Sequence, residues 1–338
     1  MATTFKFGNG NWAVKEDYAL AYNDENGNFK PLPFDFTRAS TATRVNKDGL
    51  IETVPSGKPR IDFLDNTSGH LLLEPSRTNN ITYSEDFTEW SVTASGTTLT
   101  SNSAISPDGR QTADLLESDG TNAFSRVYEA VSLTSGNNCL YSTFVKKSGS
   151  HDFASIRVQG TDVGGSGQTG STYTFTFSTE TLSYEGGGTA TSTFVENYGS
   201  GWYRIGMELT NSTVTQVIIY PKFNSSVAGE ILMWGAQLEE GSYATSYIPT
   251  SGSSVTRSVD LIQQSGFQGK VMNSTEGTIF IHFDNPIEDG DNNDFHMFRT
   301  TGTSSITDGF LFRLNTGTGV DILERVSNAT GAQFSNIV

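Results

Sequence analysis

Carboxylate side chains are the groups in this sequence best able to do chemistry, because two of them placed across a glycosidic bond can cleave it. The densest acidic sites are Glu239-Glu240 and the stretch from Asp284 to Asp294. Neighbouring residues of a strand point to opposite faces, so Glu239 and Glu240 cannot flank one bond. The sequence therefore predicts no catalytic residue and no enzyme activity, with a polysaccharide depolymerase as an alternative.

Other catalytic and metal-binding patterns fail on spacing. No two of the four histidines have the spacing of zinc ligands. They are His70, His151, His282 and His296. The Gly-Ser-Gly segments at 165–167 and 199–201 lack the spacing of a nucleophile elbow and are expected to be turns. The single cysteine, Cys139, excludes an internal disulfide, and its apolar neighbours predict a buried strand thiol.

One acidic segment has the donor pattern of a calcium loop. Residues 289–294 place oxygen donors at alternate positions. The helix–loop–helix form of such a site needs a glycine at the sixth position and a glutamate at the twelfth, where this sequence has Asp294 and Thr300. That form is excluded. A simpler calcium loop of Asp289, Asp291 and Asp294 is left open, with a solvated hairpin tip as its alternative; no other cofactor is expected.

Aromatic side chains are the candidate binding residues, because their flat apolar faces can stack on sugar rings. Trp202 and Trp234 lie within strongly apolar strand segments, which predicts that they belong to the core. Trp90, Tyr184 and Tyr198 lie at strand ends or near glycine-rich loops, where an exposed ring is easier to form. These three residues are the predicted carbohydrate-binding residues.

The elements that would position these residues are short strands. Between residues 79 and 262, strand patterns recur every 8 to 15 residues with turn signals between them, which is typical of a β-sandwich. The clearest segments are 124–128, 140–145, 154–158, 173–177, 202–209, 214–220 and 231–238. Alternation in the segment 173–177 predicts that Tyr173, Phe175 and Phe177 face the core. We expect an all-β protein whose residues 79–262 form a jelly-roll sandwich.

The flanking regions differ from this pattern. Residues 1–78 have short strands and several prolines, a hairpin at Asp48-Gly49 and an apolar run at 71–73 that we expect to be covered on both faces. Six aromatics between residues 5 and 29 indicate an extended docking region that buries them against other chains. Residues 247–254 have the composition of a linker. Residues 263–338 contain strand patterns at 277–283, 309–314 and 320–323 and are too few for a complete second sandwich.

Charge and hydropathy exclude several classes of partner. The formal net charge is −16, and no basic face is indicated, so we expect no nucleic-acid partner. No apolar run approaches the roughly 20 residues that span a bilayer, so no membrane insertion is expected. The first residues do not lead into a signal-peptide core, which predicts synthesis in a cytoplasm without secretion.

Several stretches of the sequence resemble a recurrent pattern in phage tail-fibre and other virion structural proteins. They are FDFTRASTATRV at 34–45, GHLLLEPSRTN at 69–79, YSEDFTEW at 83–90, GWYRI at 201–205, WGAQLEEG at 234–241 and YIPT at 247–250. In that pattern the middle unit is similar to a carbohydrate-binding-module jelly roll. A concanavalin- or laminin-G-like sandwich usually follows, and STEGTIF at 274–280 resembles its opening element.

The resemblance implies a bacteriophage virion protein, made in the bacterial host cytoplasm. We expect a fibre or spike component that adheres to host surface glycans, joins other virion proteins through residues 1–78 and forms a homo-oligomer, with a trimer favoured. A purely structural role, as a capsid-attached fibre, decoration protein or tail collar, is the first alternative, and a depolymerase is the second. The negative net charge favours neutral or amino sugars over acidic ones.

Overall fold

The computed structural model describes residues 13–15, 18–23, 28–65, 67, 69–93, 95–134, 138–210 and 213–263, and three strands at 295–299, 309–315 and 319–325. Side chains are described between residues 36 and 261. The chain divides into two compact units, Phe5–Gln263 and a second unit of Met1–Thr4 with Gln264–Val338. The described residues form strands, turns and one 3-10 turn, η1 (Phe87–Glu89), so the predicted all-β class is confirmed.

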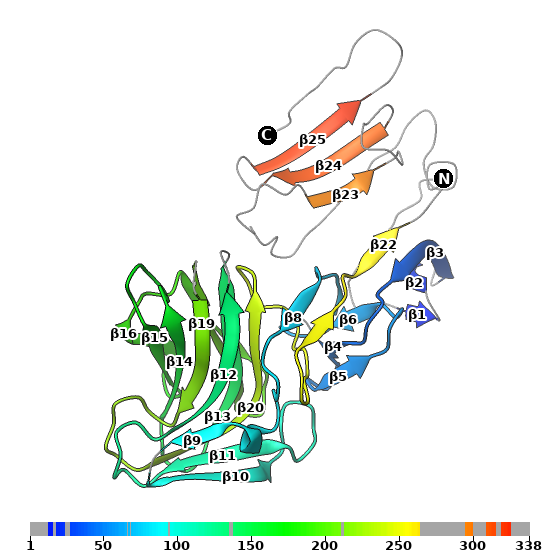
Figure 1. Ribbon diagram of the computed structural model, residues 1–338. Coiled ribbons are helices and arrows are strands. Elements are labelled where there is room, and N and C mark those ends of the chain that lie inside the picture. Colours follow the sequence, from blue (N-terminus) through cyan, green and yellow to red (C-terminus); the bar gives the residue numbers. More distant parts are fainter. Residues whose placement is uncertain are drawn as a thin grey trace. The chain divides into compact units, whose positions relative to one another are not determined.

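Two antiparallel six-stranded sheets form the sandwich of the larger unit (Figure 1). The first sheet has the order β10 (Thr97–Ala104), β11 (Ala113–Ser118), β20 (Gly229–Glu240), β13 (Cys139–Lys147), β18 (Trp202–Leu209), β17 (Ser192–Asn197). The second sheet has the order β16 (Thr181–Gly187), β15 (Gly170–Thr176), β14 (Phe153–Thr161), β19 (Thr213–Tyr220), β12 (Arg126–Thr134), β9 (Ser91–Thr93). All seven predicted strand segments between residues 124 and 238 overlap these strands and are confirmed.

The main core lies between the two sheets and follows the predicted alternation. Tyr173, Phe175 and Phe177 are 7%, 0% and 8% exposed and belong to one apolar cluster, so their inward orientation is confirmed. Thr174 lies between them, points to the outer face of the sheet and is also buried, and its hydroxyl lies 2.7 Å from that of Ser155. These two polar residues of the outer face are therefore covered as well.

Short strands attach to one end of the sandwich. A four-stranded sheet has the order β1 (Ala13–Lys15), β2 (Tyr18–Asn23), β3 (Asn28–Thr37), β22 (Leu261–Gln263). Three two-stranded pairs follow: β4 (Ala42–Val45) with β5 (Ile51–Val54), β6 (Arg60–Asp62) with β7 (His70–Leu72), and β8 (Arg77–Asn79) with β21 (Val255–Arg257). The β4–β5 pair confirms the hairpin predicted at Asp48-Gly49, where Gly49 has a φ of +78°.

A second apolar cluster packs these short strands onto the first sheet. It includes Trp202 and Trp234, which confirms that both indoles are core residues, and it also includes Tyr247. Tyr247 and Ile248 are each only 3% exposed. The linker predicted over residues 247–254 is therefore wrong: its two apolar residues bury their side chains, and the segment is part of the folded junction.

Two further local features differ from what the sequence pattern suggests. A run of three glycines, as at 186–188, is typical of a loop, but β16 continues through Gly187, where a Cβ would collide with the carbonyl oxygen of Gly170. Glycine allows that close approach of two backbones. The run at 71–73 is only half-buried, with Leu73 exposed, because β7 is one strand of a two-stranded pair.

The smaller unit has a three-stranded sheet of β23 (Phe295–Arg299), β24 (Gly309–Asn315) and β25 (Gly319–Arg325), which confirms the strands predicted at 309–314 and 320–323.

Three predictions lie outside the described residues. They are the strand at 277–283, the calcium loop of Asp289, Asp291 and Asp294, and the burial of the six aromatic side chains between residues 5 and 29. No helix in the described part of the chain has the length and apolarity needed to cross a bilayer.

Candidate functional site

Trp90, the first predicted sugar-binding residue, is a core residue. The turn η1 folds it back onto the sandwich, and Asp86 caps that turn by accepting a hydrogen bond from the Thr88 backbone N–H. The indole is 4% exposed, its ring centroid lies 4.9 Å from that of Phe87, and its Nε1 donates to the Tyr83 carbonyl at 2.8 Å. The prediction that Trp90 forms an exposed platform is wrong, because neither face of its ring is open.

Tyr184 and Tyr198, the other two predicted sugar-binding residues, lie on separate elements. Tyr184 is on the edge strand β16, is 50% exposed and donates its hydroxyl to the Gly187 carbonyl at 2.5 Å. Tyr198 follows β17, is half-buried and packs edge-on against Phe144. Burial raises the pKa of Tyr198 well above its ordinary value. Of the three predicted sugar-binding residues, only Tyr184 has the open ring that stacking on a sugar requires.

A buried cluster of charges ties the short strands together. Asp260 accepts from Arg38 at 2.9 Å and from Arg60, and Glu74 pairs with Arg60 at 2.8 Å and with Arg257. Burial would raise the pKa of Glu74, but Arg257 and Arg60 together hold it below its ordinary value. Each carboxylate in this cluster serves two arginines, so the cluster maintains the fold of the junction and leaves no free carboxylate for a ligand.

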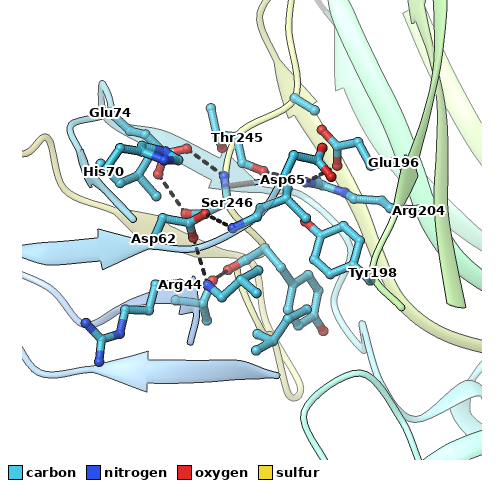
Figure 2. Close-up of a pocket in the computed structure, with 17 residues that line it drawn as sticks. Arg44, Asp62, Asp65, His70, Glu74, Glu196, Tyr198, Arg204, Thr245 and Ser246 are labelled. Atoms are coloured by element: carbon cyan, nitrogen blue, oxygen red, sulfur yellow. Dashed lines mark hydrogen bonds and ion pairs between the residues drawn. The ribbon is translucent and has the colours of Figure 1, made fainter. Parts of the chain in front are cut away.

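A cleft of about 190 Å³ lies beside this cluster, between the β4–β7 pairs and the end of the sandwich (Figure 2). Most of its polar groups already have partners within the chain. Asp62 accepts from the backbone N–H groups of Val45 and Leu64 at 2.7 and 2.8 Å. Arg204 donates to the Ser142 hydroxyl and to the Thr245 carbonyl at 2.8 Å.

Glu196 is the carboxylate of the cleft whose hydrogen bonding is incomplete. Its Oε2 is enclosed, lies 3.9 Å from Arg204 Nη1 and accepts no hydrogen bond within the described structure. Burial raises the pKa of Glu196, while Arg204 opposes that change. A carboxyl group of this kind can act as a general acid, but glycoside hydrolysis needs a second free carboxylate across the bond. Of the other carboxylates that line the cleft, Asp62 has both oxygens bonded to backbone and Glu74 is paired with arginines. Asp65 is exposed and acts to raise the pKa of Glu196.

No metal site is formed by the side chains that the structure describes. Within residues 36–261, apart from the short gaps, no three His, Cys, Asp or Glu side chains are placed to hold one ion together. Cys139 is fully buried, and burial raises the pKa of its thiol to about 12. The predicted buried strand thiol is therefore confirmed.

A second candidate site covers the outer face of the second sheet. We name it the arginine–aromatic face and define it by Phe124, Arg126, Tyr128, Arg157, Tyr220 and Phe223. Strand parity places it: Val127, Ile156 and Ile219 belong to the core, so residues adjacent to them in β12, β14 and β19 point outward. Proximity to strand ends and glycine-rich loops does not reveal this face, because most of its residues lie within strands or follow them directly. The alternation in Arg126-Val127-Tyr128 is the sequence signal that places Arg126 and Tyr128 on one outward face.

The rings and guanidinium groups of this face pack against one another. The Arg126 guanidinium carbon lies 5.8 Å from the Tyr128 ring centroid and 5.9 Å from that of Tyr220. The Arg157 carbon lies 5.6 Å from the Phe223 ring, which is 5.4 Å from the Tyr220 ring. Stacking on aromatic faces limits the rotation of both guanidinium groups while their edges keep N–H donors.

The outermost part of the face is a pair of phenylalanines. Phe124 is 42% exposed, and its ring centroid lies 5.7 Å from that of the half-buried Phe223. The Phe223 backbone N–H donates to the Ser155 hydroxyl at 2.9 Å, which fixes the segment 221–228 on the sheet. Open rings held beside positioned hydrogen-bond donors can bind a polar ligand that has flat apolar faces.

Comparisons with known proteins give little further information. No protein-family model and no curated protein matches the sequence. One similar solved structure contains the CBM22-1 and GH10 modules of the Clostridium thermocellum endo-1,4-beta-D-xylanase 10B complexed with xylohexaose. Its TM-score is 0.31 and its sequence identity is 15%, and the match covers 52% of this chain and 30% of that chain. Another is the enzymatically active domain of bacteriophage CBA120 tailspike protein 4. Its TM-score is 0.22 and its sequence identity is 11%, and the match covers 47% of this chain and 21% of that chain.

The chain spans less than a third of the length of either of these two proteins. Both TM-scores are too low to support an inference about fold or function.

Proposed function

We propose that this chain is a structural protein of a bacteriophage virion, a fibre or spike component whose jelly roll adheres to glycans on the host surface. The virion assignment depends on the sequence resemblance. The arginine–aromatic face carries the adhesion, because it combines open rings with fixed hydrogen-bond donors on one side of the sandwich. Tyr184, on the edge strand, is a separate candidate for sugar stacking.

Adhesion by this face would be weak for one chain, since a shallow sugar site buries little surface and displaces well-hydrated hydroxyls. We propose that residues 1–78 join other virion proteins and that the chain self-associates, with a trimer favoured. Several copies then bind one surface, and the overall avidity rises by roughly 10²–10⁴-fold without a new contact.

A glycan array probed with the full 338-residue chain tests the proposal. We expect binding to bacterial surface glycans, and roughly 2–10-fold weaker binding for Phe124→Ala and for Tyr128→Ala, because each removes one ring. Tyr184→Ala shows whether the ring on the edge strand contributes to binding independently of the arginine–aromatic face. If the assembled protein binds no glycan on the array, the purely structural role replaces adhesion.

The depolymerase alternative rests on the raised pKa of Glu196 in its cleft. We propose that the chain has no hydrolytic activity, since Asp62 is occupied by backbone N–H groups and the cleft, at about 190 Å³, is smaller than the roughly 300–1,000 Å³ of ordinary ligand pockets. Release of reducing sugar from a host polysaccharide, abolished by Glu196→Gln and retained in Glu52→Gln, would establish the enzyme instead. Glu52 is a suitable control because it does not line the cleft and forms a partly exposed pair with Arg44.

A further inference from the structure

We propose that the arginine–aromatic face selects glycans that carry carboxylate groups, such as uronic acid polymers. This inference rests on the proposed function and names the class of glycan. It departs from the expectation, drawn from the net charge of −16, that neutral or amino sugars are preferred.

The first observation is that three cations on this side of the sandwich have no carboxylate partner. Arg126, Arg157 and Lys222 form no ion pair with any described residue, and Lys222 lies over the Phe153 ring at 3.6 Å. Arg38, Arg60 and Arg257 of the junction, by contrast, are paired with Glu74 or Asp260. The short gaps between residues 36 and 261 contain no Asp or Glu, so every carboxylate of this region belongs to the described residues.

The second observation is that the two guanidinium groups converge. The Arg126 guanidinium carbon lies 5.9 Å from the Tyr220 ring centroid, and the Arg157 carbon lies 5.6 Å from the Phe223 ring, which is 5.4 Å from the Tyr220 ring. Burial raises the pKa of Tyr220, and both cations act to lower it. Arg157 Nη1 donates to the Thr172 hydroxyl at 2.8 Å, which anchors one end of its fork. The remaining N–H groups suit a planar carboxylate, to which arginine can donate two parallel hydrogen bonds.

The net charge of the chain does not override this local arrangement. Exposed charges farther away than about 8 Å are largely screened at physiological ionic strength. A carboxylate in contact with Arg126 and Arg157 is therefore governed by those two cations. The adjacent rings of Phe124 and Phe223 can contact the apolar face of the same sugar.

The test uses bacterial capsular polysaccharides that contain uronic acids, each paired with its carboxyl-reduced form, and the full chain as the binding protein. Reduction converts the carboxylate to a hydroxymethyl group and keeps the sugar backbone. We expect the reduced polymer to bind roughly tenfold more weakly or worse, because charge-assisted hydrogen bonds are lost. Binding of the native polymer should also weaken as salt rises from about 0.05 to 0.5 M.

Three variants locate the effect: Arg126→Gln, Arg157→Gln and Lys222→Gln. Each should weaken binding to the acidic polymer more than binding to the reduced one. Arg110→Gln is the matched control, because it changes the net charge equally at an exposed residue already paired with Asp108 at 2.5 Å. If a variant does not fold, the salt titration of the unmodified chain still tests whether binding depends on charge, and the two remaining variants locate the effect.

The outcomes separate the two proposals. Preference for the native polymers, lost in the three variants and kept in Arg110→Gln, supports the inference. Equal binding of native and reduced polymers, insensitive to salt, overturns the inference and leaves glycan adhesion standing. Absence of binding to every polymer in both forms overturns adhesion and the inference together.

Discussion

Arg38 and Asp260 are 222 residues apart in the sequence and form a fully buried ion pair of 2.9 Å. Asp260 also accepts from Arg60, and it accepts the backbone N–H of Glu74 at 3.0 Å. One carboxylate therefore connects residues 38, 60 and 74 with the segment that follows the sandwich. The short strands that precede the sandwich and the segment that follows it are held together because their charged residues are satisfied only by one another.

Asp260→Ala should destabilise the larger unit by roughly 3–5 kcal/mol, because it leaves Arg38 and Arg60 buried without their counter-charge. Chemical denaturation measures the change. Glu52→Ala is the control, since it breaks the partly exposed pair with Arg44 and should cost only about 0–1 kcal/mol. Equal effects of the two substitutions would show that the buried cluster does not hold the junction.

Phe175→Ala should destabilise the sandwich by roughly 3–5 kcal/mol, because Phe175 is fully buried between the sheets and its removal leaves a cavity. The exposed Thr215→Ala in β19 is a suitable surface control and should change the free energy of unfolding by less than about 0.5 kcal/mol. A small effect at Phe175 would contradict the inward register of β15.

Much of the sandwich could be predicted from the sequence, because alternation along a strand directly reports which residues are buried. Tyr173, Phe175 and Phe177 show this. The junction could not be predicted in the same way. Its contacts join residues up to 222 positions apart, and the segment 247–254, with its proline, glycine and serines, has the composition of a linker. Its burial comes from partners that no local pattern reveals.

The same limit explains the site residues. Trp90 lies at a strand end, as an exposed platform would, but a single 3-10 turn brings it into the core. Arg126 and Arg157 lie in different strands, and only the pairing of both strands with β19 brings them to Tyr220. Net charge averages over the whole chain and therefore hides a local group of cations.

Asp114 should make stability depend on pH. Burial raises the pKa of Asp114 from 3.8 to about 6, although the backbone N–H groups of Asn102 and Phe87 oppose that rise. Between these values the folded state binds more protons than the unfolded state, so stability falls as pH rises through the window from about 4 to 6. The loss should be roughly 1–3 kcal/mol.

Asp114→Asn should remove this part of the pH dependence. The measurement is the difference in the free energy of unfolding between the wild type and the variant at several values of pH. We expect the difference to change steadily between about pH 4 and 6 and to be constant above that window. Parallel profiles across the whole range would show that Asp114 titrates normally.

Cys139 should not react with iodoacetamide near pH 8 while the protein is folded, because its thiol is buried and has a pKa of about 12. Denaturant should expose the thiol and restore ordinary reactivity. Mass spectrometry before and after unfolding measures the modified fraction. Rapid labelling of the native protein would show that β13 opens readily at Cys139.

Hydrogen–deuterium exchange with and without a glycan that binds on the array tests the central claim most directly, because it locates the ligand without any substitution. The account predicts slower exchange in residues 124–128, 153–157 and 221–228, the segments that form the arginine–aromatic face. Slower exchange confined to residues 62–72 and 196–204, around the cleft, would contradict it and would assign binding to the site of Glu196 instead.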